Sequence, residues 1–516
     1  MPSASDKFKS RLTTVLNVVV SQTNTAIVMA GSFIVTPAIL HGLGDAAYGG
    51  WLLINSLISY MRFLDLGTSA GTVKFGAGAH ERGDWKDLGR VLDTSAAVFG
   101  VLGLIALTGT LAMAWTLPRV YPNVAAGETA AILTLGGAIA LDLTFRSFSA
   151  TIRMRSLHFV HDAIEIVSYA IFKLGLVLYF AYTRTLTYGL LAVLTLAETV
   201  IRTVLVATAA LTLVPPSRSM NPFRAERAMG RKLAGMGIAI TIITVSEVVR
   251  FQLDAAVIGY FMPDDPLDIS IFGVGTRLGS IAFTAIGVIG SVLMPRFSGL
   301  SETGDKEGLI KLLRKANLVT GLVASLVLVT IGVIGPQFLF LWLKKPWVET
   351  SGKILLIMLP AYYVGVLAGP STSLLIGRGK LRGLTILTTC EALVNFVLTV
   401  VLIKPLGLYG VTLGTAIPLV LFHGVGFPWL LKKEIGVTPG DYVRMNARAV
   451  SLGLAFLVVV GGLAFVPIPT YGRFVLLGSA CVLVFALLAL AFVPEARAEL
   501  RERLEKRRRR PTPEET

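Results

Sequence analysis

Residues 37–75 read PAILHGLGDAAYGGWLLINSLISYMRFLDLGTSAGTVKF, and this stretch decides how the chain is organised. It ends one long apolar helix, passes through a short Gly/Asp/Tyr link and begins a second apolar helix. Arg62 and Asp65 lie at i, i+3 in that second helix, so we expect both charges on one helical face. Charged side chains are costly in lipid and usually face a bundle interior or a water-filled cavity. The stretch therefore predicts a membrane bundle with a polar interior.

The composition is typical of a polytopic membrane protein. The chain has 516 residues, of which 54% are hydrophobic and 15% are charged, whereas the surface of a soluble protein needs more charge. Apolar runs of roughly 20 residues recur along the chain, as transmembrane helices require. Cys390 and Cys481 lie inside such runs, and the five histidines form no HExxH or Cys/His cluster. We therefore expect no disulfide, no metal site and no cofactor.

The apolar runs predict fourteen transmembrane helices, and no stretch reads as a separate soluble domain. We expect the spans near residues 12–40, 48–73, 89–117, 128–148, 157–182, 186–214, 233–262, 268–295, 310–343, 353–376, 383–405, 409–431, 446–467 and 472–493. Alternating loops place most of the 47 Lys and Arg on one side. By the positive-inside rule this side is cytoplasmic, with both termini there. The net charge of +16 then reflects topology and attraction to membrane lipids, so we expect no nucleic-acid partner.

A short motif recurs in two of the predicted cytoplasmic loops. Residues 83–92 (GDWKDLGRVL) and 304–313 (GDKEGLIKLL) both fit G-D-x-x-x-L-x-(R/K)-x-L, and a similar displacement relates Glu165 to Glu391. The repeat predicts an all-α fold with two parallel six-helix lobes around a central cavity, plus two C-terminal helices. The expected parts are an N-terminal lobe (1–214), a cytoplasmic linker (215–232), a C-terminal lobe (233–431), two further helices (432–493) and a basic cytoplasmic tail (494–516). Parallel repeats around a midplane site are typical of transporters that work by alternating access.

Polar residues inside the predicted spans indicate the lining of a transport cavity. We predict substrate-binding roles for Arg62, Arg250, Arg277, Asn17 and Asn24, and ion-coupling or cavity roles for Asp65, Glu247 and Asp254. Arginine grips phosphate with a planar fork, so three cavity arginines favour an anionic substrate over a cationic drug. The sequence has no GxxxxGK(S/T) motif and no visible catalytic triad, so we expect neither ATP hydrolysis nor an enzyme.

Some of these charges also have a structural interpretation. Glu198 and Arg202 lie at i, i+4, and we expect them to form an ion pair. Arg250 and Asp254 have the same spacing and can neutralise each other. Asp65 can hold the end of its helix in place instead of lining the cavity.

Further motifs extend over most of residues 12–431. They are Pro37, Leu43-Gly44, Tyr48-Gly49, Leu64-Asp65-Leu66-Gly67, Leu293-Met294-Pro295, Gly304-Asp305, Leu375-Ile376-Gly377-Arg378-Gly379-Lys380, Asn395, Gly407-Leu408-Tyr409-Gly410 and Gly414. In this order and spacing they resemble polysaccharide-exporter flippases of the multidrug/oligosaccharidyl-lipid/polysaccharide (MOP) superfamily, the group that contains O-antigen flippases. Lys344 stands where that family often has glycine.

The resemblance implies that an undecaprenyl-diphosphate-linked oligosaccharide moves across the bacterial inner membrane by alternating access. It would serve O-antigen (lipopolysaccharide), capsule or exopolysaccharide assembly, with H⁺ or Na⁺ as coupling ion and polysaccharide polymerase machinery as a partner. One alternative is a cation-coupled multidrug antiporter of the same superfamily. A second, a membrane-embedded glycosyltransferase or polymerase, would need a carboxylate-bearing loop or a sizeable outer domain, and the loops are too short for either.

Overall fold

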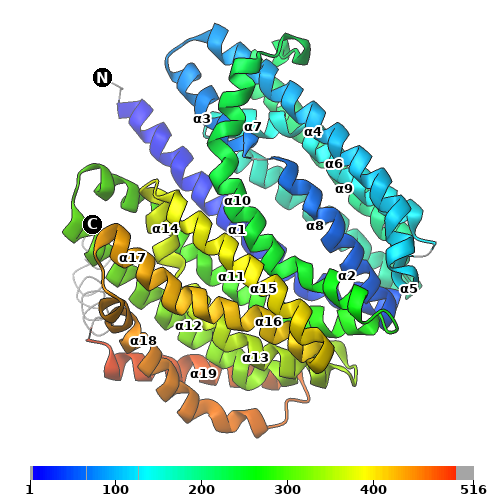
Figure 1. Ribbon diagram of the computed structural model, residues 1–516, viewed down its shortest axis with the longest axis vertical. Coiled ribbons are helices and arrows are strands. Elements are labelled where there is room, and N and C mark those ends of the chain that lie inside the picture. The colour runs from blue at the N-terminus through cyan, green and yellow to red at the C-terminus, as the bar shows by residue number, and fades with distance from the viewer. Residues whose placement is uncertain (1–3, 66, 126, 495–516) are drawn as a thin grey trace, which may run out of the picture. The chain divides into compact units, whose positions relative to one another are not determined.

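The structure is a computed structural model that describes residues 4–65, 67–125 and 127–494, and among these it also leaves out the side chains of 4–12, 14, 15, 18, 124, 125, 234–240 and 248. The predicted basic tail thus lies outside the described residues except for its first position. The chain is almost entirely helical over the described ranges and divides into two compact units, Met1–Ser270 and Ile271–Thr516 (Figure 1).

The first unit contains most of the shorter helices. Its elements are α1 (Ala4–Leu43), α2 (Asp45–Ser59), the 3₁₀ segment η1 (Tyr60–Asp65), α3 (Thr68–Glu81), α4 (Trp85–Val120), α5 (Pro122–Ala125), α6 (Thr129–Thr144), α7 (Arg146–Met154), α8 (His158–Thr183), α9 (Tyr188–Leu213), η2 (Pro215–Ser219), η3 (Pro222–Arg224) and α10 (Arg227–Phe261). Helices α4, α6 and α9 lie side by side, and α1 packs along α8 (Figure 1).

The second unit begins within α11 (Leu267–Glu302). It continues with α12 (Lys306–Leu343), α13 (Val348–Leu367), α14 (Gly369–Gly377), α15 (Leu381–Leu406), α16 (Leu408–Leu421), the π-helical turn η4 (Phe422–Gly426), α17 (Phe427–Ile435), α18 (Pro439–Val460), η5 (Gly461–Phe465) and α19 (Tyr471–Phe492). Helix α12 packs against α13, α18 and α19, and α15 packs against α16.

The structure supports a multi-span membrane protein. In the described part, eleven segments are long and apolar enough to cross a membrane, or up to twelve if the bent pair α6–α7 forms one span. Two predicted spans are not among them. The span at 48–73 is broken between α2 and α3, and the span at 233–262 includes residues 234–240 and 248, whose side chains lie outside the described part. Fourteen spans therefore stay a prediction.

The boundary between the two compact units lies after Ser270, and the lobes expected at 1–214 and 233–431 stay a prediction. Helix α10, expected to open the C-terminal lobe, packs against α2, α3 and α4 and lies in the first unit. Hydrogen bonds fix this position, because the Tyr121 hydroxyl donates to the Ala256 carbonyl at 3.2 Å and the Asn123 amide to the Pro263 carbonyl at 2.7 Å. A contact of this kind joins residues far apart in the chain and leaves no trace in a hydropathy pattern.

The two repeated loops have the same geometry. Gly83 and Gly304 have φ of +70° and +71°, a left-handed conformation that glycine adopts without strain. The next residue, Asp84 or Asp305, caps the following helix by accepting a hydrogen bond from the backbone three residues later, at 2.9 and 2.8 Å. The sequence repeat thus corresponds to one turn structure used twice.

Lys344 has the conformation expected of the glycine it replaces. It ends α12 with φ +51° and ψ +40°, and its N–H donates to the Phe340 carbonyl at 2.8 Å. Glycine suits such a C-terminal position best because it has no Cβ. The positive φ explains why glycine suits this position. Lys344 adopts the same left-handed conformation.

Candidate functional site

The helix that carries Arg62 and Asp65 is interrupted, which corrects the expectation of one continuous helical face. The α-helix ends at Ser59, residues 60–65 form a 3₁₀ segment, and Gly67 has φ +70° before α3 begins at Thr68. The Asp65 carboxylate accepts hydrogen bonds from the Ser69 backbone N–H at 2.9 Å and from its hydroxyl at 2.8 Å. Asp65 therefore satisfies a backbone donor in the first turn of α3, which a helix end buried in a membrane requires.

Asp65 also begins a chain of ion pairs that crosses the first unit. Arg146 on α7 lies 3.2 Å from Asp65 and 3.5 Å from Asp142 on α6. Asp142 in turn lies 2.7 Å from Arg202 on α9. All four side chains are between 17% and 33% exposed, so this network is partly shielded from solvent.

Arg62 lies next to this network without joining it. It lines a cavity of about 60 Å³ together with Asn55, Ser59, Asp142, Thr199 and Arg202. Within the described ranges its guanidinium forms no hydrogen bond or ion pair, although Asp142 and Glu165 attract it electrostatically. Asp65 and Asp142 already neutralise Arg146 and Arg202. Arg62 is therefore the one of these three arginines that forms no ion pair in the described part of the chain.

The expected pair between Glu198 and Arg202 is wrong. Glu198 lies 2.9 Å from Lys173 on α8, and Arg202 binds Asp142 instead. Neighbouring helices supply closer partners than the same helix does, because α9 packs between α6 and α8. The predicted site did not include Asp142 or Arg146, although their i, i+4 spacing at the end of an apolar run was a signal in the sequence.

The predicted residues of α10 divide into buried and exposed positions. Arg250 and Asp254 are each 3% exposed, whereas Glu247 is exposed. The neighbouring Gln252 accepts a hydrogen bond of 2.5 Å from Ser59. Since Arg62 lies three residues after Ser59, in η1, the structure brings Arg62 and this part of α10 into the same region of the first unit.

The predicted amide side chains on α1 are engaged by α8. Asn17 donates to the Ser156 carbonyl at 2.6 Å and accepts from the Phe159 N–H at 2.9 Å, so it fixes the start of α8. Asn24 donates to the Glu165 carboxylate at 2.9 Å. The polar stripe on α1 thus serves helix packing in the described structure, and its substrate-binding role stays a prediction.

Three acidic or imidazole groups on α8 cluster beside this stripe. Ligand atoms of His161, Asp162 and Glu165 all lie within 4.8 Å of one another, a spacing at which they could hold a metal. The His161 Nδ1 lies 3.3 Å from the Arg153 guanidinium and 3.2 Å from Asp162. A fixed positive charge beside the imidazole opposes a cation, so the contacts favour a hydrogen-bonded network.

Arg277 belongs to the second unit, on α11. Its side chain is exposed and has no hydrogen bond or ion pair in the part that the structure describes. Ser280 and Thr284, expected on the same polar face, donate to the carbonyls of Arg277 and Ser280 at 2.9 and 2.8 Å. Convergence of Arg277 with Arg62 and Arg250 stays a prediction.

The second unit holds a buried polar group that the sequence reasoning noted only in part. Glu391 on α15 is 0% exposed, and the His423 imidazole lies 3.5 Å from its carboxylate. His423 lies on the single π-helical turn, a feature frequent at functional sites. One helical turn along α15, Asn395 is 1% exposed, and neither polar atom of its side chain has a hydrogen-bond partner among the described residues. His423 gave no signal in the sequence, because a π-helical turn is not visible there.

Comparison with known proteins places the fold. One solved structure, an inward-facing multidrug resistance MATE family transporter of the MOP superfamily, has a TM-score of 0.67 at 15% identity and covers 83% of this chain and 98% of its own. Another, the lipid II flippase MurJ in an inward closed conformation, has a TM-score of 0.66 at 13% identity and covers 92% and 99%. The chain has the fold of MOP-superfamily transporters.

The sequence comparison adds one relative. The chain is 24% identical over 477 residues to the uncharacterized membrane protein EpsK of Bacillus subtilis (strain 168), covering 90% of this chain and 93% of that protein. No protein-family model matches the chain. This fold agrees with the resemblance to the MOP superfamily. The choice between a flippase and a drug antiporter depends on the chemistry of the site.

Proposed function

We propose that this protein is a flippase that moves a lipid-linked oligosaccharide, carried on undecaprenyl diphosphate, across the bacterial inner membrane by alternating access. Both termini are cytoplasmic in this proposal, and the product enters O-antigen, capsule or exopolysaccharide assembly. The fold shared with a lipid II flippase and the similarity to EpsK support the choice of a lipid-linked substrate.

Arg62 carries the proposal. Arg62, Arg202 and Asp142 line the cavity beside η1. Arg202 pairs with Asp142 and Arg146 pairs with Asp65 and Asp142, whereas Arg62 forms no ion pair among the described residues and is attracted only at longer range by Asp142 and Glu165. A membrane-embedded cation without a full counter-charge is costly and is usually retained for function. A diphosphate supplies the missing negative charge, and arginine binds phosphate oxygens in a bidentate manner.

Arg250 and Arg277 complete the proposed anion site, and Asp65, Glu247 and Asp254 are the proposed ion-coupling or cavity residues. Of these acids, Glu247 on α10 lies three residues before the buried Arg250 and is the first candidate to test for H⁺ or Na⁺ coupling. Asp65 already binds Ser69 and Arg146, so its contribution is to hold the break in the helix that presents Arg62.

Transport by reconstituted protein tests the assignment. Proteoliposomes would contain a fluorescent undecaprenyl-diphosphate saccharide. A membrane-impermeant quencher added outside would measure how the fraction of label in the outer leaflet changes with time. We expect Arg62→Ala to slow flipping by roughly tenfold or more, since a charge-assisted contact contributes about 1.5–3 kcal/mol. Arg62→Lys should restore part of the rate. Arg82→Ala, which removes an exposed surface pair with Asp87, is the matched control.

A cation-coupled multidrug antiporter is the second candidate, favoured by the similarity to the MATE transporter. Arg62, which forms no ion pair in the described ranges, disfavours a cationic drug in the cavity, because like charges repel. Uptake of a fluorescent cationic drug into the same proteoliposomes separates the two functions. Drug uptake driven by an ion gradient, together with no saccharide flipping, would overturn the flippase proposal.

A further inference from the structure

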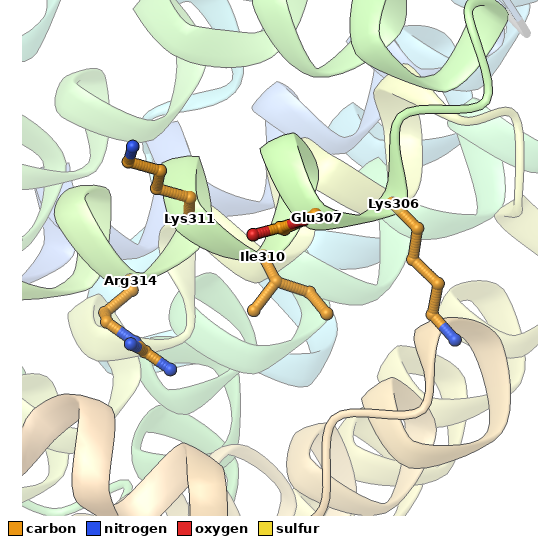
Figure 2. A pocket seen from close by; sticks show the side chains of 5 residues that line it. All are labelled: Lys306, Glu307, Ile310, Lys311 and Arg314. Atoms are coloured by element: carbon orange, nitrogen blue, oxygen red, sulfur yellow. The ribbon is translucent and has the colours of Figure 1, made fainter.

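The N-terminal end of α12 carries a basic pocket that the transport proposal does not use. The pocket has a volume of about 610 Å³ and is lined by Lys306, Glu307, Ile310, Lys311 and Arg314 (Figure 2). The three cations are exposed, and none of them forms an ion pair within the described ranges. Three positive charges against one carboxylate give the pocket a net positive charge, so an anion is its natural ligand.

The geometry of the pocket places two cations on either side of an apolar residue. In Figure 2, Lys306 and Arg314 extend to the same side, with Ile310 between them, while Lys311 extends the other way. The turn between α17 and α18 lies next to Lys306, because a Cβ on Gly436 would lie 3.3 Å from the Lys306 Nζ. Gly436 also has φ +76°, so this glycine both makes the turn and leaves room for Lys306.

An acid at the start of α18 is already engaged. Arg314 interacts electrostatically with Asp441. The Asp441 carboxylate accepts hydrogen bonds from the Thr438 hydroxyl at 2.6 Å and from its N–H at 3.2 Å, as part of the capping box that starts α18. Asp441 therefore stabilises a helix end and reduces the positive charge of the pocket only in part.

The length of α12 places the pocket at the level of lipid head groups. The helix has 38 residues, about 57 Å at a rise of about 1.5 Å per residue, whereas the hydrocarbon core of a bilayer is about 30 Å thick. All its charged residues lie between Lys306 and Lys315, and the remainder to Leu343 is uncharged. The charged first turns therefore extend beyond the hydrocarbon into the phosphate layer.

The cap at the start of α12 distinguishes this pocket from a nucleotide site, and the ion pairs of the first unit's repeated loop distinguish the two loops. The α12 N-terminus is closed by Asp305, which accepts the Gly308 N–H, so phosphate recognition must rely on side chains. In the corresponding loop of the first unit two of the three cations are paired, Arg82 with Asp87 at 3.3 Å and Arg90 with Glu226 at 3.0 Å. In the α12 pocket none of the three cations forms an ion pair within the part of the chain that the structure describes.

We propose that the α12 pocket binds the phosphate of an anionic phospholipid head group. Lys306 and Arg314 hold the phosphate oxygens, Lys311 adds to the attraction, and Ile310 packs against the glycerol region of the lipid. Flexible cations without directional backbone donors suit a mobile head group, and basic pockets between membrane helices on the cytoplasmic side are known to bind such lipids. The inference does not depend on which substrate the protein transports.

Binding of phosphatidylglycerol to the full-length protein in detergent tests this proposal. Native mass spectrometry would compare the retention of phosphatidylglycerol with that of phosphatidylcholine. We expect preferential retention of the anionic lipid, with affinity reduced roughly tenfold or more in the triple variant Lys306→Gln, Lys311→Gln, Arg314→Gln, since each basic residue near the surface contributes to attraction. Glu307→Gln should increase the affinity, because it removes the pocket's own carboxylate.

The control variant is Arg82→Gln, Lys86→Gln, Arg90→Gln, which changes the net charge equally in the first unit and should leave lipid retention unchanged. Equal loss in both triple variants would show attraction by total charge and overturn a defined site. Glycerol 3-phosphate should not compete at the same concentration, and effective competition would show a soluble phosphate site instead. Displacement of the lipid by a polyglutamate peptide at low salt, with no preference for phosphatidylglycerol over phosphatidylcholine, would indicate a protein partner and overturn the lipid assignment.

Discussion

The polar interiors of the two units are built differently. In the first unit, buried and half-buried charges are paired across helices, as in the chain from Asp65 to Arg202, and Asn24 binds the carboxylate of Glu165. In the second unit, Glu391 is fully buried, and the His423 imidazole lies 3.5 Å from its carboxylate. Asn317 and Asn395 there are 0% and 1% exposed and have no side-chain hydrogen-bond partner in the described part of the chain.

Glu165 and Glu391 are worth comparing because the predicted repeat relates them by a displacement similar to that of the loop motif. Helix α1 supplies the amide that binds Glu165, whereas the π-helical turn after α16 supplies the imidazole beside Glu391. The two carboxylates therefore have different partners. Charge pairing stabilises the first unit, while the second unit retains polar groups whose burial is costly.

The largest expected effect is on the paired network of the first unit. Asp142→Ala would leave Arg146 with Asp65 alone and Arg202 without its partner. We expect a loss of about 2 kcal/mol in the free energy of unfolding, less than for a fully buried pair because these side chains are partly exposed. The thermal unfolding midpoint in detergent measures this loss. Asp142→Asn keeps the shape and should cost less, and an unchanged midpoint for Asp142→Ala would show that the network does not stabilise the unit.

A single type of substitution should have opposite signs in the two units. Asn395→Leu removes a buried amide without partners and should stabilise the protein by about 1 kcal/mol, whereas Asn24→Leu removes the hydrogen bond to Glu165 and should destabilise it by about 1–2 kcal/mol. Thermal unfolding of the two variants, measured side by side, checks the comparison. Two shifts of the same sign would mean that the interiors do not differ in this way.

Glu165 and Glu391 should differ in their importance for transport. Glu391→Gln neutralises a fully buried carboxylate beside His423, and we expect saccharide flipping to fall by roughly tenfold. Glu165→Gln retains a hydrogen-bond acceptor for Asn24 and should alter the rate by less than about threefold. The proteoliposome assay described for Arg62 measures both rates, and equal losses would argue against a special role for the second unit's carboxylate.

The smallest effect is expected at the bridge between α8 and α9. Lys173 lies 2.9 Å from Glu198, with side chains 27% and 18% exposed. Lys173→Gln keeps most of the aliphatic stem and a hydrogen-bond donor, so we expect a loss of about 0.5–1 kcal/mol. Thermal unfolding at low and high salt provides the measurement. A loss as large as that of Asp142→Ala would show that the bridge belongs to the main network.

The sequence predicted some of the charged residues of the candidate site but not which residues they pair with. Arg62, Asp65, Arg250 and Asp254 stood out because charge is rare inside apolar runs. The pairing partners could not be deduced, since Glu198 and Arg202 were expected to bind each other and instead bind Lys173 and Asp142. Spacing along one helix reports only local neighbours, and these ion pairs join different helices.

The sequence by itself determined the membrane class, the order of most helices and the repeated glycine–aspartate turn. These features follow from hydropathy and local backbone preference, which act over a few consecutive residues. Only the tertiary structure decided that residues 60–65 form a 3₁₀ segment after α2, that α10 packs against α2, α3 and α4, and that Arg62 forms no ion pair among the described residues. Each of these features depends on contacts between segments that are distant in the chain. The local sequence does not determine which distant segments meet.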